Sequence, residues 1–144
     1  MAANTDPLFG AVPIVPVPVT FASGDTTTKK TLADYSSATD YAYGAIVDSI
    51  QCCTDDTAAI NLAVYRYNGS TDFYIGNINI PAGSGYTTVA AVEGMRFLSL
   101  DLGYILLPAG TGTAWLLRAN CVATMTAAKI LTITVSSRTL KAPT

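Results

Sequence analysis

The sequence has 144 residues, of which 50% are hydrophobic and 12% charged, with a formal net charge of −2 and no histidine. This length predicts one domain, and the high apolar and low charged fractions exclude an intrinsically disordered chain. The acidic balance disfavours binding to nucleic acid, which needs a basic surface. Without histidine, catalytic triads and zinc sites that use this residue are excluded.

The uncharged stretches of the chain do not predict a membrane span. Residues 7–24 carry four prolines, which break a helix. Residues 102–117 are interrupted by glycine and proline and are shorter than the ~20 residues that a spanning helix needs. The first ten residues lack the basic region of a signal peptide. We therefore expect no membrane partner.

Residues 1–28 are rich in proline and predict an extended N-terminal arm, followed by one domain over residues 29–144. Proline fixes φ, disfavours helix before it and cannot serve a central sheet ladder. The arm should lie against something, because burial of each large apolar side chain is worth about 1.5–3 kcal/mol. Two surfaces remain open, its own domain and a neighbouring subunit. The candidate partner-contact residues of the arm are Leu8, Phe9, Val12, Ile14, Val15, Val17 and Val19.

From residue 31 onward the sequence predicts short strands separated by turns. Side chains alternate with a period of two, most clearly where Ile130, Thr132 and Thr134 alternate with Leu131 and Ile133. Asn-Gly, between two aromatic and β-branched runs, predicts a hairpin. The predicted strands include residues 46–53, 61–67, 73–80, 95–102, 115–121 and 130–137.

A near-repeat marks two similar corners of the predicted fold. The sequence INIPAGSG at residues 78–85 recurs as ILLPAGTG at residues 105–112, and in both the glycines permit positive φ. Neither glycine-rich corner precedes a lysine or a helix, so neither is a phosphate loop. With little helical pattern elsewhere, the chain predicts an all-β fold, a jelly-roll-like two-sheet β-sandwich of about eight antiparallel strands.

The residues that could support catalysis or metal binding are few. Asp55 and Asp56 are adjacent and could hold a hard cation, but a solvated, side-chain-capped turn is the preferred interpretation. Cys52, Cys53 and Cys121 predict reduced, buried thiols, because the adjacent pair cannot bridge without strain. We expect no enzymatic activity, no cofactor and no metal.

The aromatic residues offer two alternative roles, a protein interface and a sugar-binding face. Tyrosine suits an interface because it is large, rigid and polar at its tip, and the surface poor in charge favours that alternative. The candidate interface aromatics are Tyr65, Tyr67, Tyr74, Tyr86 and Tyr104.

The order of the segments at residues 62–76, 78–85, 104–110 and 129–135 resembles the small head decoration (cement) proteins of tailed bacteriophages. It combines a strand, a polar turn with glycine, a tyrosine-rich strand, two Pro-Ala-Gly corners and a final strand with alternating threonines. The resemblance covers roughly residues 49–136. It implies a jelly-roll subunit, often a homotrimer, that binds the major capsid protein on the outside of the head and has no catalytic residues.

The resemblance also implies a place in the virion, on the outer capsid surface, after assembly in the host cytoplasm. Two alternatives stay open. The first is a carbohydrate-binding β-sandwich module, which the tyrosines and Trp115 would serve. The second is a tail, fibre or neck component of the same particle, because these parts also use stacked β-domains.

Overall fold

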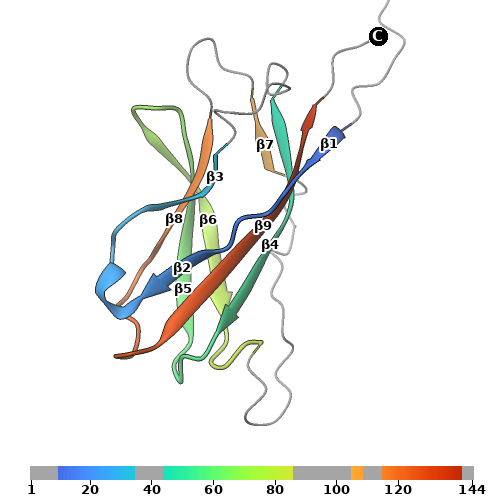
Figure 1. Cartoon of the computed structure of the whole chain (residues 1–144). Helices are drawn as coiled ribbons and strands as arrows, with labels where there is room; N and C mark the ends of the chain where they lie inside the picture. The colour runs from blue at the N-terminus through green and yellow to red at the C-terminus, as the bar shows by residue number, and fades with distance from the viewer. Residues whose placement is uncertain (1–9, 35–43, 86–104, 109–114, 141–144) are drawn as a thin grey trace, which may run out of the picture.

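The computed structural model describes residues 10–34, 44–85, 105–108 and 115–140, and its regular structure is β apart from one short 3-10 turn, η1 at Ser23–Asp25 (Figure 1). This confirms the all-β prediction. The strands in chain order are β1 Gly10–Ile14, β2 Val19–Ala22, β3 Lys30–Ala33, β4 Ala45–Thr54, β5 Ile60–Tyr67, β6 Asp72–Ile80, β7 Ile105–Leu107, β8 Leu116–Cys121 and β9 Ile130–Leu140.

The strands form two antiparallel sheets in a sandwich. Sheet A has the order β1-β9-β4-β7, with β2 also paired to β9, and sheet B has the order β3-β8-β5-β6. Because β1 and β2 pair with successive parts of β9, they act as one interrupted edge strand. The strand pairs are nested along the sequence. β1 and β2 pair with β9, β3 pairs with β8, β4 pairs with β7, and β5 pairs with β6 at the centre. This nesting is the strand order of a jelly roll, which confirms the predicted fold.

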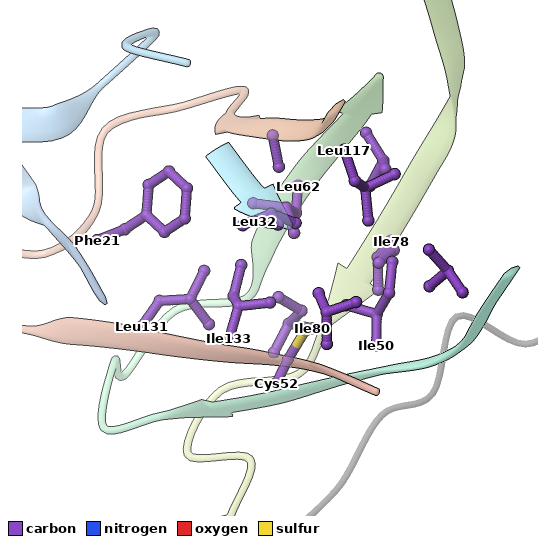
Figure 2. Packing of buried hydrophobic residues seen from close by; sticks show 14 of the residues in the cluster. Phe21, Leu32, Ile50, Cys52, Leu62, Ile78, Ile80, Leu117, Leu131 and Ile133 are labelled. Carbon is purple, nitrogen blue, oxygen red and sulfur yellow. The ribbon is translucent and has the colours of Figure 1, made fainter. Parts of the chain in front are cut away.

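The strand pattern explains why the sheets pack face to face. In β9, Leu131, Ile133 and Val135 are buried, while the threonines between them are only partly buried. Figure 2 shows Leu131 and Ile133 of sheet A pointing toward Leu62 of sheet B across the core. Alternate side chains of each strand face the opposite sheet, so the period of two in the sequence becomes one apolar layer.

The predicted arm is partly integrated into the sandwich. The segment is extended as expected, and β1 and β2 pair with β9 along much of the length of that strand. The physical reason is that the prolines fall where an edge strand tolerates them, at Pro13 within β1 and at Pro16 and Pro18 between the strands. Of the two open alternatives, the structure shows the first for residues 10–22, because β1 and β2 pair with β9 of the same chain.

The predicted hairpin and the first Pro-Ala-Gly corner both have the expected turn chemistry. β5 pairs with β6, and Asn68 accepts backbone hydrogen bonds from Ser70 and Thr71 in the turn, where Gly69 has a φ of +95°. At the corner, Gly83 has a φ of +66°. The predicted strand at residues 95–102 and the glycines of the second corner lie outside the described residues.

Candidate functional site

Three of the five candidate tyrosines come together on sheet B. Tyr65 lies in register between Tyr74 of β6 and Arg118 of β8, and Tyr67 lies opposite Asp72. The rings of Tyr65 and Tyr74 meet edge to face, with centroids 5.7 Å apart and planes at 61°. Because Val64 next to Tyr65 is buried in the core, alternation places Tyr65 on the face directed away from sheet A.

Two cations contact these tyrosine rings, and one carboxylate pairs with both cations. Lys29 Nζ lies 4.4 Å from the ring centre of Tyr65, and Arg118 lies 4.5 Å from the ring centre of Tyr67. Asp72 pairs with both cations, at 2.9 Å from Lys29 Nζ and 3.3 Å from an Arg118 nitrogen. We call the six residues Lys29, Tyr65, Tyr67, Asp72, Tyr74 and Arg118 the tyrosine surface. Its charges sum to +1, and cation–π contacts hold its cations over the rings.

The tyrosine surface keeps aromatic area accessible to a partner. Tyr74 is 59% exposed, whereas its neighbour Phe73, which pairs with Arg66, lies on the opposite face of sheet B with its ring 5.6 Å from that of Trp115. Monomer surfaces bear isolated exposed apolar residues, but clustered aromatics with arginine are typical of interface centres. Tyr86 and Tyr104, the other two candidates, lie outside the described residues.

The ionic part of this surface was missed in the sequence. Lys29 lies before β3 and Arg118 lies in β8, so neither is near Asp72 along the chain. The available signal was the alternation of Tyr65, Arg66 and Tyr67, which places two rings on one face. It could not reveal that β8 would lie beside β5, because that neighbour depends on the global strand order.

The candidate contact residues of the arm divide into buried and exposed positions. Ile14 and Val19 pack against the core, whereas Val15 is 82% exposed and Val17 is 71% exposed. The stretch between β1 and β2, which contains Pro16 and Pro18, is not paired with β9. Leu8 and Phe9, and the side chain of Val12, lie outside the described part of the structure.

A groove opens where the edge strand is interrupted. It has a volume of about 370 Å³ and lies between the stretch from Ile14 to Val19, the β3 region from Thr31 to Asp34, and Val135 with Ser137 on β9. The walls are largely aliphatic. The groove lies at the mouth between the two sheets, and Val15 and Val17 form part of its rim.

The acidic pair at the end of β4 is a structural turn. Asp56 is 1% exposed, and it accepts hydrogen bonds from Ala58 and Thr126. Asp55 accepts one from the backbone of Ile130 and lies 3.7 Å from Lys129. The predicted capping is therefore present, but Asp56 is buried instead of solvated, because the loop between β8 and β9 covers it.

Burial and hydrogen bonding have opposite effects on the pKa of Asp56. Burial raises it, but the Thr126 hydroxyl and the backbone groups of Ala58, Thr126 and Thr57 together hold it below its usual value. Every partner stabilises the charged form. Both oxygens of the Asp56 carboxylate thus accept hydrogen bonds from donors of the protein itself.

The three cysteines are free thiols. Cys52 and Cys121 are buried, whereas Cys53 is half-buried, because neighbours in a strand face opposite sides of the sheet. Burial raises the pKa of Cys52 to about 12 and that of Cys121 to about 11. Within the described ranges, no three Cys, Asp or Glu side chains are grouped as a metal site would need.

No family model, curated protein or solved structure matches the chain. Among the residues that the structure describes, no helix is long and apolar enough to cross a membrane.

Proposed function

We propose that the chain is a non-enzymatic structural protein of a virus particle, a decoration protein that binds and stabilises the head of a tailed bacteriophage. The observation that carries the proposal is the tyrosine surface on the outer face of a jelly roll. Jelly rolls recur in viral capsid domains, and tyrosine with arginine is the composition of binding hot spots. The partner is the major capsid protein, and the place is the outer surface of the head.

The apolar rim of the groove provides a second contact in this proposal. Val15 and Val17 are the most exposed of the large hydrophobic residues in the described part of the chain. Burial of both in a contact with another subunit would stabilise it by about 3–6 kcal/mol before the costs of association. The resemblance to decoration proteins also implies a homotrimer, in which such a rim would contact a neighbouring copy.

A carbohydrate-binding module is the alternative from another class. Tyr74 offers a ring to stack on a sugar, and jelly-roll sandwiches include lectin domains. The polar groups beside that ring already have partners, however, since Asp72 pairs with Lys29 and Arg118, and Tyr67 donates to the carbonyl of Gly69. This favours a protein partner, which can use exposed aromatic area without free hydrogen-bonding groups.

The test is cosedimentation with empty heads of the encoding virus that were assembled without this chain. We expect the intact protein to bind and Tyr74→Ser to bind at least about tenfold more weakly, which corresponds to about 1.4 kcal/mol. Val122→Ser is the matched control, because Val122 is 50% exposed but lies outside both surfaces. The proposal fails if intact protein stays in the supernatant, or if the two variants bind equally.

Two further measurements separate the alternatives. A glycan array that captures the intact protein, with binding lost in Tyr74→Ala, would favour the carbohydrate-binding module. The position of the chain in a particle reconstruction distinguishes a head protein from a tail, fibre or neck component. Light scattering on the purified chain tests the homotrimer, because a three-fold contact gives a number of copies that is divisible by three.

A further inference from the structure

Among the strands that the structure describes, β6 forms an edge of sheet B that lacks the features that usually prevent strands from pairing between molecules. β6 lies at the end of sheet B and pairs only with β5 among the described strands. Its nine residues, DFYIGNINI, contain no proline and a single charge, at Asp72. The unpaired backbone groups of a long, uncharged edge are a template for another strand.

The other described edges are protected. The edge formed by β1 and β2 contains Pro13 and is interrupted at Pro16 and Pro18. β3 has four residues and begins at Lys30, directly after Lys29. β7 has three residues. Proline, lysine and short length are the usual means of blocking an edge, so the contrast singles out β6.

Residues 76–80 of β6 are complementary to themselves when two copies run antiparallel. Asn77 and Asn79 are exposed on the outer face, whereas Ile78 and Ile80 face the core. With a two-fold axis at Ile78, Asn77 lies opposite Asn79 of the second copy, and Gly76 lies opposite its Ile80. Amides then meet amides on one face, and apolar residues meet on the other.

An amide row already exists at this edge. Asn79 Nδ2 donates to Asn61 Oδ1 of β5 at 3.0 Å, across the strand pair. In the antiparallel arrangement, Asn77 of a second copy would extend this row by one strand. Charge favours the same arrangement, because the two Asp72 residues would lie at opposite ends, roughly 40 Å apart at about 3.4 Å per residue.

We propose that residues 76–80 of β6 pair antiparallel with the same residues of a second copy, which joins the two B sheets into one continuous sheet. Such a contact is isologous and closes at two copies. It is separate from any three-fold contact and does not rest on the proposed role in the particle, because it is measured on the purified chain.

The experiment introduces like charges at the proposed axis. In the double variant Asn77→Lys, Asn79→Lys, lysines lie directly opposite lysines, which destabilises a strand pair. Light scattering should show that this variant of the full chain has half the molar mass in solution of the intact chain. The matched control, Ala123→Lys with Thr124→Lys, adds two charges at exposed positions in the loop between β8 and β9, outside the groove and the tyrosine surface, and should leave the mass unchanged.

Charge reversal and hydrogen exchange keep the test decisive if a variant folds poorly. A mixture of the lysine variant with Asn77→Glu, Asn79→Glu should recover the pair, because lysine then lies opposite glutamate. In the intact chain, amide exchange at residues 76–80 should slow as concentration rises. A monomer at every soluble concentration, or a mass that the lysines do not change, overturns the proposal. So does protection of β6 that arises only when heads are added, since the strand's partner would then be another protein.

Discussion

Thr126 donates two hydrogen bonds to the carboxylate of Asp56, from its backbone N–H at 2.9 Å and from its hydroxyl. The two residues are 70 positions apart in the chain. In the same turn, the N–H of Gly83 donates a hydrogen bond to the backbone carbonyl of Asp56, and the Thr54 hydroxyl donates one to the carbonyl of Ile130. One buried aspartate therefore joins the end of β4, the first Pro-Ala-Gly corner and the loop between β8 and β9.

The first prediction concerns this junction. Asp56→Asn should lower the free energy of unfolding by about 1–3 kcal/mol, because an amide has only one oxygen and leaves at least one of the donors on Ala58 and Thr126 without its acceptor. Thr126→Val should cost less, since the backbone bond survives. Chemical denaturation of both variants measures the difference, and an Asp56→Asn protein as stable as the parent would contradict the role assigned to the junction.

The second prediction concerns acid stability. The pKa of Asp56 is lowered in the folded protein from 3.8, so below that value the unfolded chain binds more protons than the folded chain. The contribution of Asp56 is therefore present above about pH 4 and is lost as pH falls through its folded pKa. Thermal unfolding between pH 7 and pH 2 should show this loss, and Asp56→Asn should show a shallower decline. Equal slopes would refute the assignment.

The third prediction concerns thiol reactivity. Because burial raises the pKa of Cys52 and Cys121 to about 12 and about 11, these thiols stay protonated near pH 8 and cannot act as nucleophiles. Iodoacetamide should modify the half-buried Cys53 first in the native protein, and all three cysteines in denaturant. Peptide mass spectrometry identifies the sites. Native labelling of Cys52 at the rate of Cys53 would show that the core opens far more readily than its packing indicates.

The same shifts predict the behaviour in base. A thiol whose folded pKa is raised above 9.0 favours the folded state while it stays neutral. As pH rises above that value, the unfolded chain loses protons first, so stability should fall. Cys52→Ala should reduce this alkaline decline, although it also creates a small cavity that lowers stability at every pH.

The fourth prediction tests whether the proline-rich segment belongs to the domain. Phe21 of β2 is fully buried, and Phe21→Ala should cost about 3–5 kcal/mol. Val17→Ser should change stability by less than about 0.5 kcal/mol, because Val17 is largely exposed. Urea unfolding distinguishes the two. A neutral Phe21→Ala would contradict the packing of β2 against the core.

Local patterns predicted the strands well. Alternation predicted strands at residues 46–53 and 130–137, and the structure has β4 at Ala45–Thr54 and β9 at Ile130–Leu140. β9 extends beyond the predicted end at residue 137 because its polar residues there pair with both β1 and β4. Hydropathy alone does not predict this backbone pairing. The hairpin of β5 and β6 followed from Asn68 and Gly69, whose conformational preferences act within the turn itself.

The segment with the prolines shows where the sequence left two alternatives open. Proline correctly excluded a central strand, but an edge strand beside β9 satisfies the same constraint. The choice between an arm and an edge depends on whether β9 has a free side. The ionic contacts of the tyrosine surface also depend on the global strand order, because Lys29, Asp72 and Arg118 meet only after β3, β8, β5 and β6 are in order.

The nested strand order also constrains how the chain acquires its structure. β9 pairs with β1, β2 and β4, so Gly10 can pair with Leu140 only after the 129 residues between them have been synthesised. Contacts of such long range make folding slow, because loop closure must precede the gain from pairing. During synthesis, the hairpin of β5 and β6 can form early, whereas sheet A must wait for the last strand. A nascent chain would thus expose the apolar face of sheet B until β9 has been synthesised, which is the interval in which a chaperone would be of most use.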